Sequence, residues 1–159
     1  MSYFYSFVTK KLERSVKDYI KSNKGQEIFL GVMGRVKAKR SQIALFIYEI
    51  VDIIAFPNIS QNPEYQAMVT DSWYDIVSEN IQFRQNFTLT PLGILHSHVL
   101  GGKTASELDF EFMKRLSKKL NRLIMIIIYY SPEGRFYEKA YVLVKNGETE
   151  IVQCHPFSK

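Results

Sequence analysis

Apolar and polar residues follow two different periods along the chain, and each change of period marks a predicted element. In residues 8–24 the apolar positions recur at steps of three or four, which is typical of an amphipathic helix: Leu12, Val16, Tyr19 and Ile20. Residues 106–120 repeat this pattern, and residues 64–85 carry a third apolar face that includes Trp73, which we expect in the core. The sequence therefore predicts three helices.

Runs of aromatic and β-branched residues separate these helices and predict strands over 26–34, 42–56, 92–98, 123–130, 136–144 and 150–154. The run at 123–130 is apolar throughout, which predicts a strand buried on both faces. Residues 58–63 and 99–103 are predicted loops, and Pro57 ends the strand before the first of them. Because strands and helices interleave, we expect an α/β or α+β class around one sheet, as a single domain over residues 1–159.

Composition narrows the class of protein. Hydrophobic residues make up 46% of the chain, which excludes intrinsic disorder, and a net charge of +5 is too small to indicate nucleic-acid binding by itself. The single cysteine, Cys154, cannot form an intrachain disulfide, so a disulfide-stapled secreted scaffold is excluded and a reducing compartment is indicated. Because no apolar run approaches the roughly 20 residues of a spanning helix and no signal peptide is recognisable, we predict a cytoplasmic protein without a membrane segment.

Two of the three histidines lie one residue apart, in His96-Ser97-His98. Side chains at i and i+2 of a strand point to the same face, so both imidazoles can converge on one ion. Asp109 falls in the first turn of the following predicted helix, near the end of that strand. Two imidazoles and one carboxylate are a ligand set of catalytic zinc, which keeps its fourth position for water.

This spacing resembles the JAMM signature of the MPN-domain (Mov34/PAD1-type) metallopeptidases, His-x-His followed after seven residues by Ser-x-x-Asp. His96, His98, Ser106 and Asp109 match it in register. The wider form Gly-x-x-His-Ser-His is matched as well, by Gly93 and Ser97. The resemblance implies an MPN-like, cytidine-deaminase-like mixed β-sheet flanked by helices.

The family also uses a glutamate on an early strand as general base, seven residues before a glycine, and Glu27 with Gly34 fits that pairing. The family pattern has another glycine three residues after the glutamate, whereas here Gly31 comes one residue later. Aligning on Gly31 would place Ile28 at the base position and leave no catalyst, so we prefer Glu27. A second departure is Val99, where the family most often has proline; we expect it to affect loop stiffness rather than a ligand.

The resemblance further implies an activity. One zinc ion held by His96, His98 and Asp109 would activate water, Glu27 would act as general base, and Ser106 would stabilise the oxyanion. Family members with all these residues cleave peptide or isopeptide bonds after the C-terminal tail of ubiquitin or a ubiquitin-like protein. The expected partner is therefore a ubiquitin-like protein or its conjugate; the oligomeric state, a homodimer included, is left open.

Other interpretations of the same residues stay open. Ser-x-x-acid before an apolar run is also a helix-capping signature, so Ser106 and Asp109 can serve as a cap as well. Cys154-His155 is expected to be a strand end rather than a second metal site, because no further His or Cys completes it. The alternative functions are a RadC-like nucleic-acid-associated protein and a non-catalytic MPN scaffold.

Overall fold

The computed structural model describes residues 1–40, 44–56, 72–85, 88–99 and 102–157. Within these residues lie seven strands, three α-helices and one short 3-10 helix. Their bounds are β1 Ser2–Phe7, α1 Lys10–Ser22, β2 Phe29–Arg40, β3 Ala44–Phe56, α2 Trp73–Phe83, β4 Thr90–His98, α3 Glu107–Leu116, the 3-10 helix Ser117–Lys119, β5 Arg122–Tyr130, β6 Phe136–Asn146 and β7 Glu148–Pro156.

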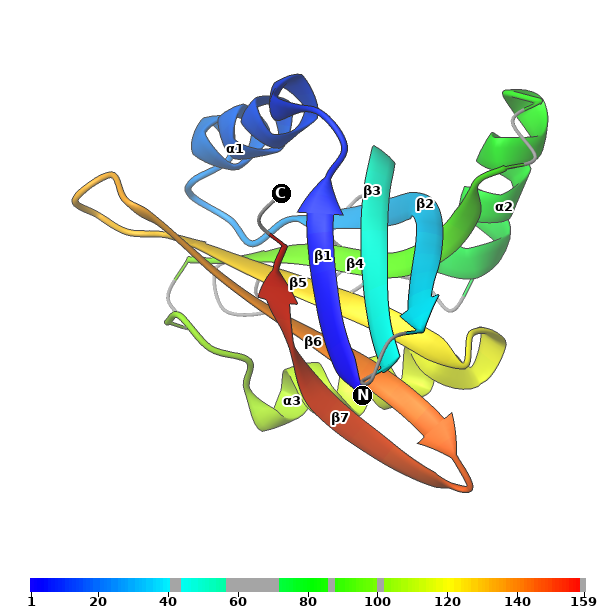
Figure 1. Cartoon of the computed structure of the whole chain (residues 1–159). Helices are drawn as coiled ribbons and strands as arrows, with labels where there is room; N and C mark the ends of the chain where they lie inside the picture. The colour runs from blue at the N-terminus through cyan, green and yellow to red at the C-terminus, as the bar shows by residue number, and fades with distance from the viewer. Residues whose placement is uncertain (41–43, 57–71, 86–87, 100–101, 158–159) are drawn as a thin grey trace.

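The seven strands close into a barrel in the order β1-β3-β2-β4-β5-β6-β7 (Figure 1). The first and last strands make the closure, because β1 pairs in parallel with β3 on one side and with β7 on the other. The predicted α/β architecture, an MPN-like mixed sheet flanked by helices, is therefore wrong. The prediction failed because it did not include β1. In this strand Tyr3 and Tyr5 are buried and alternate with less buried neighbours, and the two edges of the strand pair with β3 and β7.

Two apolar clusters fill the molecule. All seven strands contribute to the first, which is therefore the barrel interior, and Val16 and Ile20 of α1 pack into it. The second covers the outside of the sheet around β2, β4 and β5, beneath helices α2 and α3. Along β5 the side chains alternate between the two clusters, so both faces of this strand are buried, as its continuous apolar run predicts.

Most predicted elements are present with shifted limits. The first and third helices, the strand at 92–98 and the three C-terminal strands are confirmed to within a few residues. Strand β2 differs most, because it starts at Phe29 rather than residue 26 and continues through Arg35, Lys37 and Lys39, whose side chains are exposed. Trp73 begins α2 and is confirmed in the core; residues 64–71 of that predicted helix, the loop 58–63 and Pro57 lie outside the described residues.

Across the described part of the chain, each helix is too short or too polar to cross a membrane.

Candidate metal centre

Strand β4 carries both histidines on the outer face of the barrel. Antiparallel pairing sets His96 opposite Phe29 of β2, and parallel pairing sets it beside Ile127 of β5. Phe29 and Ile127 both belong to the outer cluster, whereas Ile28 and Ile128, the neighbours of Ser97, belong to the barrel interior. The two-residue spacing therefore directs His96 and His98 outward, towards α3, as predicted from strand geometry.

Helix α3 supplies the carboxylate through its first turn. Ser106 is the N-cap: its Oγ accepts a hydrogen bond from the Asp109 N–H at 3.2 Å, and the Asp109 Oδ2 atom accepts one from the Ser106 N–H at 2.9 Å. This reciprocal capping box fixes the side chain of Asp109 as well as the start of the helix. The predicted capping role of Ser106 is confirmed.

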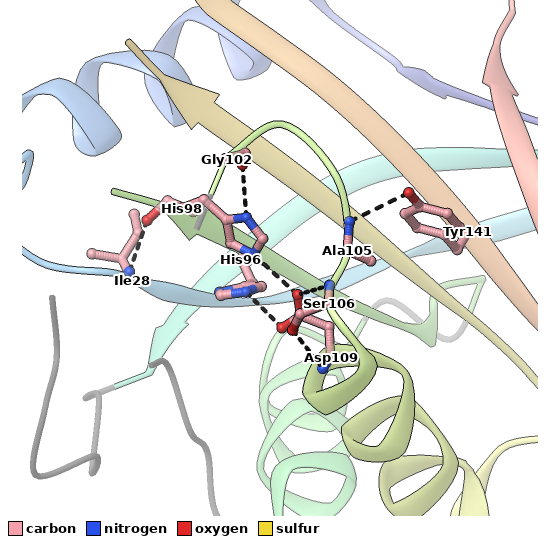
Figure 2. Close-up of polar contacts among 9 residues, drawn as sticks. Ile28, His96, His98, Gly102, Ala105, Ser106, Asp109 and Tyr141 are labelled. Carbon is pink, nitrogen blue, oxygen red and sulfur yellow. Dashed lines mark hydrogen bonds and ion pairs between the residues drawn. The ribbon is translucent and has the colours of Figure 1, made fainter. Parts of the chain in front are cut away.

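The three predicted ligands converge, as Figure 2 shows. His96 Nε2 lies 3.1 Å from Asp109 Oδ1, and His98 Nε2 lies 3.1 Å from Asp109 Oδ2. One ligand atom from each residue falls within 4.8 Å of the others, and both imidazoles are buried. Zinc–nitrogen and zinc–oxygen bonds of about 2.0–2.2 Å place tetrahedral ligands roughly 3.3 Å apart, so this donor set fits a metal ion.

His98 shows why a cation belongs at this position. Its Nδ1 atom lies 2.8 Å from the backbone carbonyl of Gly102, and because a carbonyl only accepts, Nδ1 must carry a proton. In the neutral ring Nε2 then has no proton and would face the Asp109 carboxylate as a second acceptor. The contact is favourable only when a cation, either a second proton or a metal ion, lies on Nε2.

The pKa values of the ligands reflect the same arrangement. Burial works to lower the pKa of His98, but its hydrogen bond to Asp109 and the charge of that carboxylate outweigh burial, so the pKa is raised. Burial dominates at His96 and lowers its pKa. Burial works to raise the pKa of Asp109, yet the hydrogen bonds from both histidines hold it well below its usual range. The site thus keeps an ionised carboxylate between two imidazoles.

Aromatic packing orients the His96 ring. Phe29 stacks on it with ring centroids 5.4 Å apart and an interplanar angle of 20°, and Phe112 of α3 packs edge-on against Phe29. Among the described residues, the buried Nδ1 atom of His96 has no hydrogen-bond partner. Van der Waals contact with Phe29, rather than a second hydrogen bond, therefore sets the orientation of this ring.

Glu27 lies just before β2, and its side chain is almost fully buried, with 2% of its surface exposed. Burial raises the pKa of Glu27 to about 7; the charge of His98 acts to lower it and that of Asp109 to raise it further. A backbone hydrogen bond from Val99 also favours the ionised form. Glu27 is therefore a buried carboxyl group that interacts with the candidate metal ligands and has a pKa near neutral pH.

The two alignments considered for the base differ clearly in the structure. Ile28 belongs to the barrel interior, on the side away from the histidines, whereas Glu27 interacts electrostatically with His98 and Asp109. Gly34 sits at a shift in the β2–β3 register, opposite an extra residue of β3, and a Cβ atom there would lie 1.8 Å from the carbonyl oxygen of Glu49. Gly34, the glycine seven residues after Glu27, is thus required because the backbones of β2 and β3 approach closely there.

Several groups around the site were not predicted. The Gly102 carbonyl, the ring of Phe29 and the Val99 N–H each contact a predicted site residue. Val99 was expected to affect only loop stiffness; instead it contributes a backbone donor that proline lacks. Phe29 could have been found from the pairing of β2 with β4, since it lies opposite His96. The Gly102 carbonyl and the Val99 N–H are backbone groups and leave no signal in the sequence.

Cys154 and His155 do not form a shared site. Cys154 is buried in the barrel interior, whereas His155 is exposed and packs beside Phe4, with ring centroids 6.2 Å apart. Successive strand residues point to opposite faces, which separates the two side chains. Within the described ranges, the group of three ligands at His96, His98 and Asp109 is the one that could hold a metal ion.

Comparison with known proteins supports the fold alone. No family model matches the chain, and no curated protein matches it. The solution structure of protein DSY2949 from Desulfitobacterium hafniense is similar, with a TM-score of 0.62 and 19% sequence identity. The match covers 98% of this chain and 94% of that one. The two chains therefore share a fold along nearly their whole lengths, and the chemistry of the site must be argued from its own residues.

Proposed function

We propose that this protein is a zinc-dependent peptidase that cleaves isopeptide or peptide bonds after the C-terminal tail of a ubiquitin-like modifier. The observation that carries the proposal is the convergence of His96 and His98 on the Asp109 carboxylate, with the buried carboxyl group of Glu27 beside them. The resemblance to the JAMM signature supplies the substrate class. The proposal depends on these side chains and not on an MPN fold, which the barrel contradicts.

The ligand set favours zinc over harder cations. Magnesium and calcium prefer sites made of oxygen atoms, whereas two imidazole nitrogens with one carboxylate suit zinc and leave one position for water or substrate. When bound, zinc supplies Lewis acidity and lowers the pKa of a coordinated water to about 7.

Glu27 moves the proton. It accepts a proton from the attacking water and then delivers it to the amine that leaves, so that one carboxyl group serves first as base and then as acid. Its pKa of about 7 balances the two steps, because a much stronger acid would hold the proton too weakly and a much weaker one would be protonated already. Burial, which sets this pKa, also keeps bulk water away from the carboxylate.

Ser106 stabilises negative charge on the substrate. Its Oγ accepts from the Asp109 N–H within the cap, so the hydroxyl proton is not used in that contact. The side chain is exposed at the N-terminus of α3, where it can donate to a carbonyl oxygen that gains charge during attack. The cap therefore positions the hydroxyl for its second role.

The test is cleavage of a lysine-linked ubiquitin-like conjugate by zinc-loaded protein, followed by gel electrophoresis. We expect turnover that stops with chelator and returns with zinc. Glu27→Gln should reduce the rate by at least about 100-fold, because it removes the proton acceptor with little change in shape. Glu133→Gln, at an exposed turn position, is the matched control and should keep full activity.

Two results would contradict the proposal: cleavage that survives in Glu27→Gln, and cleavage that persists in protein stripped of metal. A linear fusion carrying the same C-terminal tail, assayed beside the lysine-linked conjugate, separates isopeptidase activity from trimming of a precursor. Preference for the linear fusion assigns the protein to precursor processing.

A further inference from the structure

The Ser97 side chain makes an unusual contact between β4 and the segment that carries Glu27. Its Oγ atom accepts a hydrogen bond from the Ile28 N–H at 2.8 Å, and its own N–H donates to the Ile28 carbonyl at 3.1 Å. Ser97 and Ile28 are both buried. Two hydrogen bonds, one of them through a side chain, thus join the residue between the histidines to the residue after Glu27.

This contact extends the strand pairing beyond the end of β2. The β2–β4 register pairs Phe29 with His96, so its continuation sets Ile28 opposite Ser97 and Glu27 opposite His98. Regular pairing would use the Ser97 carbonyl as acceptor for the Ile28 N–H, whereas here the hydroxyl takes that place. The side chain therefore maintains the register where the regular strand has ended.

Residues on both sides of His98 hold the Glu27 segment. Val99 donates its backbone N–H to the Glu27 carboxylate, and Ser97 binds the backbone of Ile28. Residues 23–28 lie between α1 and β2 in neither a helix nor a strand, so a local connection rather than a regular element carries Glu27. The position of Glu27 against the metal ligands depends on these contacts.

We propose that Ser97 is a positioning residue, whose hydroxyl holds Glu27 in register with His98 and the metal site. The expected effect of Ser97 on the rate of cleavage rests on the proposed function, whereas its effect on the position of Glu27 does not. Ser97 acts through the backbone of Ile28, to which its Oγ is hydrogen-bonded, and is not one of the three candidate metal ligands. Loss of the hydroxyl should release Glu27 while leaving the metal ligands in place.

The test uses Ser97→Ala, with Ser97→Thr as the variant that restores a hydroxyl. Ser131→Ala is a matched control, because Ser131 is also buried and makes the same pair of contacts with Arg135: its Oγ accepts from the Arg135 N–H at 3.1 Å and its N–H donates to the Arg135 carbonyl at 2.8 Å. Both alanine variants lose one buried hydrogen bond and should lose similar stability. Ser97→Ala should still bind Zn²⁺ with unchanged affinity.

Kinetics on the lysine-linked conjugate separate positioning from general stability. We expect Ser97→Ala to lower kcat about 10- to 100-fold with KM within about twofold of wild type, and Ser131→Ala to change neither. Ser97→Thr should recover most of the rate. In the Glu27→Gln background Ser97→Ala should have no further effect, because it acts only through Glu27.

A second readout needs no substrate. In protein labelled with ¹³C at the glutamate carboxyl groups, the Glu27 resonance is the one that Glu27→Gln removes. Zn²⁺ at fixed pH should shift this resonance in wild type, Ser97→Thr and Ser131→Ala, and by less than half as much in Ser97→Ala. If the shift pattern holds but no conjugate is cleaved, the proposed function fails and the positioning role stands. A full shift in Ser97→Ala, or an equal loss of kcat with Glu27 already replaced, overturns the role of Ser97.

Discussion

The Nε2 atom of His98 lies 3.1 Å from Asp109 Oδ2, while the opposite ring nitrogen donates to the Gly102 carbonyl. The Gly102 contact fixes the tautomer in which Nε2 can bind a metal, so the fold prepares the ligand before any ion arrives. His96 makes the equivalent contact with the other carboxylate oxygen. Asp109 therefore contacts both rings and supplies the negative charge that a cation at this site would balance.

Asp109→Asn should remove most of the metal affinity. The amide carries no charge to balance the ion. Replacing a residue that only hydrogen-bonds to a metal ligand already changes metal affinity about 10- to 100-fold, so we expect the loss of a ligand carboxylate to weaken Zn²⁺ binding by more than about 100-fold. Calorimetric titration of the metal-free protein measures it. Asp75→Asn, in the first turn of α2, is the matched control and should bind as wild type does. Zinc binding by Asp109→Asn at wild-type strength would mean that the ion binds elsewhere.

Glu27 should make the metal-free protein less stable as the pH rises. The pKa of Glu27 is about 7 in the folded protein and 4.5 in the unfolded chain. Between these two pH values the folded state therefore binds a proton that the unfolded chain has released. The free energy of unfolding therefore falls as the pH increases from 4.5 to 7, by about 3 kcal/mol in total.

Glu27→Gln isolates this contribution from that of the two histidines. Because glutamine stays neutral, the variant should gain stability relative to wild type across the same pH window, and the difference should level off above pH 7. Urea unfolding in chelator at pH 5 and pH 8 measures the two free energies, with Glu133→Gln as the exposed control. A difference that grows towards low pH would have the wrong sign for a raised pKa.

Ser106→Ala should affect both stability and turnover, whereas another helix cap should affect stability alone. Thr9 caps α1 by accepting a hydrogen bond from the Leu12 N–H at 3.0 Å, much as Ser106 caps α3. Each alanine variant should lose about 1 kcal/mol in thermal or urea unfolding. Only Ser106→Ala should also lower kcat, by about 100-fold, on the lysine-linked conjugate. Equal turnover in the two variants would restrict Ser106 to capping.

The convergence of the candidate metal ligands could be predicted from sequence because it follows from short-range geometry. A two-residue spacing on a strand fixes the shared face of His96 and His98, and the cap signature fixes Asp109 in the first turn of α3. Glu27 is different, since it lies about 70 residues before the histidines and depends on strand pairing. That Glu27 would lie near the two histidines was expected from the family resemblance and not from a local sequence pattern.

Barrel closure could not be predicted for a related reason. Tyr3 and Tyr5 give β1 an alternating pattern, but six residues before a basic helix do not indicate which strands they join. The parallel contacts with β3 and β7 connect segments about 40 and 150 residues away. The length of β2 was missed because residues 35–39 are all exposed, so neither face of this half of the strand carries the buried apolar positions that mark a strand.

Gly93→Ala tests how closely the histidine strand must approach its neighbour. Gly93 has φ +152°, and a Cβ atom there would lie 1.9 Å from the carbonyl oxygen of Ile124, its pairing partner on β5. The methyl group can be accommodated only if β4 moves away from β5, three residues before His96. We expect a loss of at least about 3 kcal/mol in unfolding free energy and weaker Zn²⁺ binding.

Two further glycines separate steric clash from backbone strain as causes of the stability that Gly93→Ala should lose. Gly134 has φ +85°, and a Cβ atom there would lie 3.7 Å from its nearest neighbour, so Gly134→Ala should cost only the backbone strain of about 1 kcal/mol. Gly25 has nothing within 4 Å and no positive φ, so Gly25→Ala should be neutral or slightly stabilising. Neither should change zinc affinity. If Gly93→Ala were no worse than Gly134→Ala, β4 could shift without cost, and the close packing of β4 against β5 would not be what holds His96 in place.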